Sequence, residues 1–182
     1  MTNAFRFSLI LLVAVLLVIA LRAQAPEGAP KPGAEHDKLS YFVGKWATEG
    51  EAKATSYGPG GKYTATETCE WFAGKFAVVC KADGNMMDGK LNSLSVLSYD
   101  SYGKSYVYFE TNNWGENIFS RGKVEGDTWT WNNDSPMGDN KVMHGRFTMK
   151  QVSQDMASYK FEMATGSDPM TLVMEGKQSR QK

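Results

Sequence analysis

The stretch from Tyr63 to Ala82, YTATETCEWFAGKFAVVCKA, decides the fold. Its apolar and aromatic side chains fall on alternate residues, which are Tyr63, Ala65, Cys69 and Trp71 and then Phe76, Val78, Cys80 and Ala82. Successive side chains of a β-strand point to opposite faces, so this period of two predicts two strands with one apolar face each. Gly74 and Lys75 lie between them and predict a hairpin with a type II′ turn, which takes glycine at its first central position.

Residues 1–25 have the features of a secretory signal peptide. Arg6 precedes an uncharged run at 7–21, which is shorter than the ~20 residues that a membrane-spanning helix needs. Ala23-Gln24-Ala25 resembles a cleavage site. We therefore expect a periplasmic or secreted protein, with residues 1–25 either removed or kept as an N-terminal anchor. An uncleaved anchor would be the one expected membrane contact.

The two cysteines are expected to meet across the hairpin. The two-residue loop pairs Trp71 with Val78 and places Cys69 directly opposite Cys80. Opposed residues on antiparallel strands have Cα atoms ~4.5–5.5 Å apart, within the range that a disulfide bridges. In an exported chain this arrangement favours a Cys69–Cys80 disulfide. The alternative is a pair of free, buried thiols that pack as small hydrophobes.

The remainder of the chain is also divided into short periodic segments. Residues 26–33 form a linker rich in proline and glycine, and 34–182 form a single domain that begins with a short helix at 34–42. Turn residues separate the further strands, which are expected at 46–54, 91–99, 104–112, 117–124, 128–132, 142–152, 157–164 and 170–178. About ten short antiparallel strands indicate an all-β sandwich or a closed barrel.

Several segments resemble a known family. Gly44-Lys45-Trp46, after a short helix, resembles the GxW motif that opens the first strand of lipocalins and other calycin barrels. Four segments are similar to a family of uncharacterised bacterial lipocalin-like domains, many of them exported: PGAEHDKLSYFVGKW (32–46), WFAGKFAVV (71–79), LSYDSYGKSYVYF (97–109) and GKVEGDTWTW (122–131). The resemblance implies an antiparallel up-and-down barrel in which Trp46 packs across the closed end against a basic residue, for which Arg180 is the candidate. It implies no activity, substrate or catalytic residue.

The sequence contains few groups for catalysis. It has no GxSxG, P-loop or dinucleotide-binding glycine motif, and its two histidines, His36 and His144, lie in polar surroundings. We therefore predict no catalytic residue, no metal site and no cofactor. The formal net charge is zero and there is no basic stripe, which argues against nucleic-acid binding.

The expected barrel interior is the candidate site. The residues predicted to line it and to bind a ligand are Trp71, Trp129, Trp131, Tyr159, Phe161, Met163, Leu172 and Glu67. Glu67 is the one carboxylate on the apolar face of the hairpin, and we expect it to pair with Arg146 or a lysine, or to anchor a ligand. The favoured function is binding of a small hydrophobic or amphipathic molecule. The alternatives are a filled barrel that acts as a structural or interaction protein of the envelope, and an enzyme of unknown reaction. The oligomeric state is left open.

Overall fold

The computed structural model describes residues 30–87, 89–137 and 140–182, so the predicted signal peptide and the first half of the linker lie outside the described residues. A short helix α2 (Ala34–Asp37) continues as the 3₁₀ helix η1 (Lys38–Phe42) and is followed by ten strands. The strands are β1 (Gly44–Ala52), β2 (Gly61–Phe72), β3 (Ala77–Met86), β4 (Gly89–Asp100), β5 (Ser105–Asn112), β6 (Asn117–Glu125), β7 (Thr128–Pro136), β8 (Val142–Ser153), β9 (Met156–Thr165) and β10 (Thr171–Arg180). Within these ranges, no helix combines the length and the apolar character that crossing a membrane requires.

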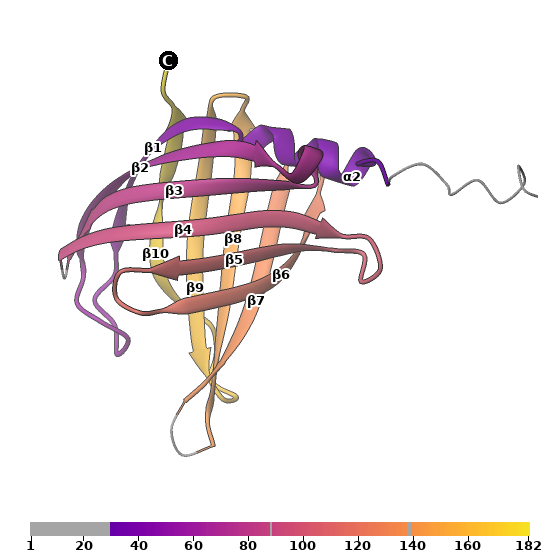
Figure 1. Ribbon diagram of the computed structural model, residues 1–182. Coiled ribbons are helices and arrows are strands. Elements are labelled where there is room, and N and C mark those ends of the chain that lie inside the picture. The colour runs from indigo at the N-terminus through magenta and orange to yellow at the C-terminus, as the bar shows by residue number, and fades with distance from the viewer. Residues whose placement is uncertain (1–29, 88, 138–139) are drawn as a thin grey trace, which may run out of the picture. The chain divides into compact units, whose positions relative to one another are not determined.

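The strands form a closed antiparallel barrel. Each strand pairs with its neighbours in sequence, and β1 also pairs with β10, which closes the ladder. Figure 1 shows β2 to β5 running across the near side, with β7 to β10 running steeply behind them. Closure leaves no strand edge free. The predicted up-and-down barrel with a short N-terminal helix is confirmed.

The central hairpin has the predicted register but a different turn. Trp71 pairs with Val78 and Cys69 with Cys80, and a disulfide joins the two cysteines. Gly74 has φ 67° and ψ 30°, and Lys75 has φ 73°. Positive φ at both central residues is typical of type I′, so the type II′ prediction was wrong. Both turns suit the twist of paired strands, and both leave the register unchanged.

Two strands depart from the predicted pattern. β7 continues to Pro136 instead of ending at residue 132, because its last residues pair with the start of β8. In β10 the register shifts between Leu172 and Met174, so that Leu172 lies opposite Glu162 and Met174 opposite Phe161. Adjacent residues of a strand face opposite ways, and this bulge therefore places Leu172 on the outer face. The prediction that Leu172 points into the barrel was wrong.

Trp46 and Arg180 seal the end of the barrel that the helix covers. Trp46 is buried, and its indole Nε1 donates a hydrogen bond to the carbonyl oxygen of Phe42 at 2.8 Å. The Arg180 guanidinium lies 4.3 Å from the centre of the Trp46 ring. It also donates to the carbonyl oxygens of Val43 at 2.6 Å and Tyr41 at 3.0 Å. The arrangement expected from the family resemblance is confirmed.

Removing the Trp46 side chain should destabilise the fold. Trp46→Ala would leave a cavity beneath Arg180, and we expect the free energy of unfolding to fall by about 3–5 kcal/mol in urea denaturation. Trp114→Ala is the control, because Trp114 is 44% exposed and lies outside the closed end. A Trp46→Ala protein that unfolds at the urea concentration of the parent would refute the structural role.

The disulfide should persist in the purified protein. Thiol titration of the unfolded, unreduced chain should detect no free thiol, because Cys69 and Cys80 are the two cysteines of the sequence. Replacing both with serine should lower the free energy of unfolding by about 2–3 kcal/mol or less, since the closed loop is short. Detection of two free thiols would contradict the disulfide.

Candidate functional site

The packing of the barrel interior is uneven. Some inward-facing side chains are buried, and they include Val78, Leu97, Tyr106, Trp129 and Met149. Other inward-facing side chains keep part of their accessible surface, and they include Ala65, Glu67, Ala82, Tyr108, Glu110, Phe161 and Met163. Side chains of a fully packed core would be buried. We infer from this uneven burial that the barrel encloses a lumen that its own side chains do not fill completely.

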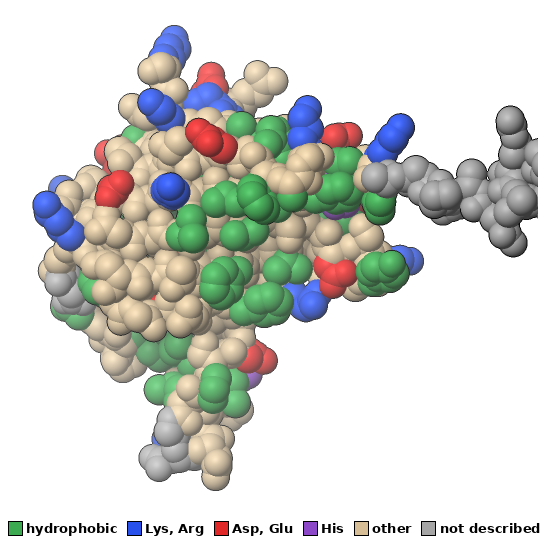
Figure 2. All heavy atoms as spheres, viewed as in Figure 1, with side chains coloured by type: hydrophobic (Ala, Val, Ile, Leu, Met, Phe, Trp, Pro, Cys, Tyr) green, Lys and Arg blue, Asp and Glu red, His purple; other side chains and the backbone are tan. Residues whose placement is uncertain are grey.

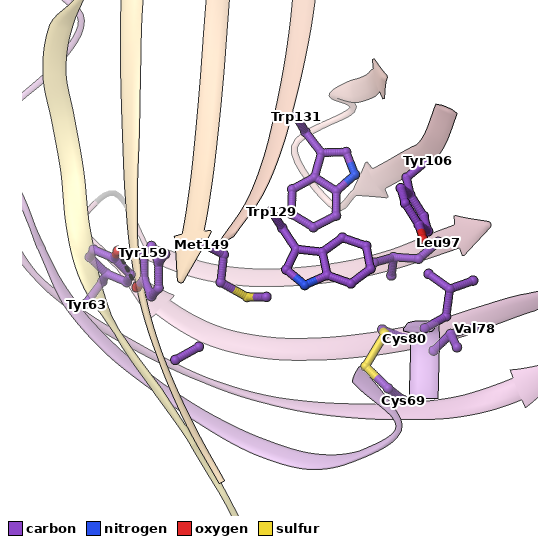
Figure 3. Close-up of a cluster of buried hydrophobic side chains, with 12 residues drawn as sticks. Tyr63, Cys69, Val78, Cys80, Leu97, Tyr106, Trp129, Trp131, Met149 and Tyr159 are labelled. Atoms are coloured by element: carbon purple, nitrogen blue, oxygen red, sulfur yellow. Dashed lines mark hydrogen bonds between the residues drawn. A yellow bond between two sulfur atoms is a disulfide. The ribbon is translucent and has the colours of Figure 1, made fainter. Parts of the chain in front are cut away.

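The filled part of the lumen is aromatic. Trp129 and Trp131 from β7 stack with their ring centres 5.5 Å apart, and Phe42 of η1 packs edge-on against Trp129 at 5.0 Å. Figure 3 shows the rings of Trp129 and Trp131 on the inner side of the barrel, with Tyr106 and the disulfide facing them. The indole Nε1 atoms of Trp129 and Trp131 are buried and have no hydrogen-bond acceptor among the described residues.

Tyr63 of β2 and Tyr159 of β9 meet inside the barrel, over the line along which β1 pairs with β10. Their hydroxyl oxygens are hydrogen-bonded at 2.5 Å. The two rings lie against Gly50 and Gly176, where any Cβ would come within 2.5 Å of a tyrosine atom. The tyrosines therefore occupy this side of the barrel, and the partly exposed inward side chains of β2, β3 and β5 mark where free space is inferred.

A small acidic group faces that free space, and we call Glu67, Tyr108 and Glu110 the lumen acidic group. The strand register places Cys69, Cys80, Ser95 and Glu110 side by side in one row across β2 to β5. Glu67 is two residues before Cys69 on the same face of β2. One oxygen of its carboxylate lies within 4.8 Å of both cysteine sulfurs. The sulfurs are bonded to each other, so they offer no thiolate to a metal ion.

Glu67 has no partner of its own. No ion pair or hydrogen bond to its carboxylate is found within the described ranges, in contrast to the expected pairing with Arg146. Arg146 instead binds Glu162 at 3.1 Å on the outer face, because these two residues are opposed across β8 and β9. Burial, and secondarily the charge of Glu110, raise the pKa of Glu67 to about 7.

Glu110 is held differently from Glu67. The Tyr108 hydroxyl donates a hydrogen bond to its carboxylate. Burial raises the pKa of Glu110, and this hydrogen bond partly offsets the rise. Burial and the negative charge of Glu110 raise the pKa of Tyr108 well above its ordinary value, so the phenol stays protonated and remains a donor. Of the two lumen carboxylates, Glu67 is therefore the one left open to another molecule.

The predicted ligand-binding residues are divided among three places. Trp129 and Trp131 form the aromatic floor, and Tyr159 is engaged with Tyr63. Trp71, Phe161, Met163 and Glu67 face inward and are half-buried. Leu172 lies outside. Sequence reasoning missed Tyr108, Glu110 and Ser95, although the alternation of Tyr106, Tyr108 and Glu110 along 105–112 places these three residues on one face.

A hollow of about 870 Å³ lies on the outer surface over β1, β2 and β7 to β10. Lys177 pairs with Glu49 within it at 2.7 Å, whereas Lys150 and Lys160 pair with Asp127 and Glu162, which do not line it. It includes Tyr159 but none of the other residues predicted to bind a ligand. The lumen, which holds an unpaired carboxylate, is therefore the better candidate site.

Glu67 should make the stability of the protein fall as pH rises. Its pKa of about 7 in the folded state lies above the ordinary value of 4.5, so between these values the folded protein keeps a proton that the unfolded chain releases. The free energy of unfolding should therefore fall across this window, with Glu67 contributing on the order of 1–3 kcal/mol. Urea denaturation at several pH values would show a flatter profile for Glu67→Gln. Glu70→Gln, on the outer face of the same strand, should keep the parent profile, and an unchanged profile in Glu67→Gln would contradict the assignment.

Comparisons with known proteins support the barrel fold. Rv2717c from M. tuberculosis is 16% identical, with 82% of this chain and 99% of that chain covered and a TM-score of 0.56. The S-type phycobiliprotein lyase CPES from Guillardia theta is 10% identical, with 82% and 94% covered and a TM-score of 0.56. No curated protein matches the sequence. Residues 31–180 match a family described as a protein of unknown function, DUF1579, and the chain belongs to that family.

Proposed function

We propose that this protein is an exported barrel that binds a small hydrophobic or amphipathic molecule in its lumen. The observation that carries the proposal is the partial exposure of inward-facing side chains on β2, β3, β5 and β9. These side chains combine an apolar wall, which includes Phe161 and Met163, with the lumen acidic group. Ligand sites commonly have this composition, with mostly apolar walls and a few placed polar groups.

Two further observations support the proposal. The Cys69–Cys80 disulfide is consistent with an oxidising compartment and hence with export. The chain shares its fold with a protein described as a phycobiliprotein lyase, which supports a barrel that acts on other molecules. The histidines lie away from the lumen acidic group, since His36 is buried in α2 and His144 pairs with Asp134 at 2.6 Å on the outer surface. A binding role therefore fits the lumen better than general-base catalysis by histidine.

An apolar surface patch favours a second candidate, an interaction protein. Val79, Val96, Phe109 and Phe119 are opposed in one row across β3 to β6, on the outer face. Phe109 is 38% and Phe119 53% exposed. Figure 2 shows hydrophobic side chains gathered over this part of the barrel. An exposed patch of this kind can mark a protein–protein contact, whether or not the lumen is used.

Filling the lumen should abolish ligand binding. Ala82 faces inward beside Glu67, so Ala82→Trp would occupy the free space. The neutral dye N-phenyl-1-naphthylamine should bind the parent saturably, with a rise in its fluorescence, and Ala82→Trp should weaken its affinity by about tenfold or more. Lys81→Trp, on the outer face of the same strand, is the control and should bind as the parent does.

Two results would count against the lumen. One is the absence of saturable binding across neutral, cationic and anionic apolar probes, which would favour the interaction protein. The other is dye binding that Ala82→Trp leaves unchanged, which would move the site to the outer surface. Thermal melting of Ala82→Trp shows whether the variant is folded.

A further inference from the structure

We propose that the lumen selects amphipathic ligands that carry a positively charged nitrogen, with the cation against Glu67 and the apolar part along the inner aromatic side chains. This inference rests on the proposed ligand binding and specifies the class of ligand. An amine with an aliphatic or aromatic body is the simplest member of that class.

The charges that face the lumen are negative. The lumen carboxylates belong to Glu67 and Glu110, whereas the lysines and arginines of the described strands alternate onto the outer face, as Lys81, Lys123, Arg146, Lys160 and Lys177 do. Arg180 is the exception, and it is engaged at the closed end by the Trp46 ring and two backbone carbonyls. The described strands therefore supply no free cation to neutralise the two carboxylates.

Glu67 is the carboxylate that remains available. Tyr108 donates to Glu110 and not to Glu67, and no described residue forms an ion pair with Glu67. Its surroundings are apolar or uncharged, since the nearest atoms include the disulfide sulfurs and its strand partners are Trp46 and Ala82. Keeping a carboxylate in such a place is costly unless it gains a partner. A cationic group of a ligand would be that partner.

The aromatic side chains favour the same class of ligand. Phe147 and Tyr159 stack at 5.5 Å, and the ring of Trp131 lies 6.1 Å from that of Phe147. Such rings give an apolar body a large contact surface, and their faces attract cations. An anionic head group would be repelled by both lumen carboxylates, so simple fatty acids are disfavoured.

The indole N–H groups of Trp129 and Trp131 are also unsatisfied in the lumen, and because an ammonium group is itself a donor, the cation of a ligand would pair with Glu67 and not with them. Trp129 and Trp131 are 1% and 5% exposed, and their N–H groups lack an acceptor among the described residues. A buried donor without an acceptor is costly. Figure 3 places both rings inside the barrel, on the wall opposite the disulfide that lies beside Glu67.

Binding of a cation should depend on pH. The groups that face Glu67 are Glu110 and Tyr108 from β5 and the disulfide, which does not titrate, while its strand partners on β1 and β3 carry no charge. The pKa of Glu67 is about 7, so the ionised form that attracts a cation increases as pH rises through neutrality. The affinity for a cation should therefore also rise as pH rises through neutrality.

Three probes of ten carbons each test the proposal: decylamine, decanol and decanoate. Each is titrated by calorimetry or by displacement of N-phenyl-1-naphthylamine. At about pH 8 decylamine should bind about tenfold or more tightly than decanol, and decanoate should bind more weakly than either. Glu67→Gln should remove the preference for the amine, so that decylamine and decanol bind this variant about equally. Glu70→Gln should keep the preference.

The pH dependence gives a second readout. Lowering the pH to about 6 should weaken decylamine binding to the parent by about tenfold, because only about a tenth of Glu67 would then be ionised. Glu67→Gln should lose this dependence. Thermal melting of Glu67→Gln shows whether the variant is folded.

The outcomes separate the two proposals. If no probe and no dye binds, the proposed ligand binding itself fails. If decanol binds as tightly as decylamine, if decanoate binds most tightly, or if Glu67→Gln keeps the preference for the amine, the cation selectivity is overturned and lumen binding stands.

Discussion

The pairing of β1 with β10 is the constraint on which the rest of the structure depends. It extends from Trp46 opposite Arg180 to Ala52 opposite Met174. Without it, both strands would be open edges. With the ladder closed, every second side chain of ten strands must face one common interior. The chemistry of the lumen is therefore decided by which residues occupy the inward positions.

The two ends of the lumen differ because the helix covers only one of them. At that end the polar groups of the seal have partners: Trp46 and Arg180 bind backbone carbonyls of η1 and the residue after it, and the Tyr106 hydroxyl donates to the Glu35 carboxylate at 2.5 Å. Glu67 is the strand partner of Trp46, but its carboxylate takes no part in this network. It is therefore a carboxylate that neither the seal nor the outer ion pairs satisfy.

Glycines and tyrosines determine where the free space lies. At Gly50 and Gly176 the missing Cβ atoms let Tyr63 and Tyr159 lie close to the sheet and bond to each other. This fills the side of the lumen along β1 and β10. On the opposite side, β3 presents the small, partly exposed Ala82 toward the interior beside Glu67, and we infer that the lumen acidic group faces the room it leaves. The shape and the charge of the candidate site thus have a common origin in side-chain size.

The sequence by itself determined the elements whose causes are local. Alternation and turn residues predicted the strands, and the hairpin register brought Cys69 opposite Cys80. The GxW resemblance pointed to Trp46 and Arg180. The tertiary structure decided what depends on distant partners. A bulge in β10 turned Leu172 outward, Arg146 found Glu162 instead of Glu67, and β7 extended to Pro136 because β8 was there to pair with it. The acidity of the lumen belongs to this second group, since only closure brings Glu67 and Glu110, from strands β2 and β5, to face the same space.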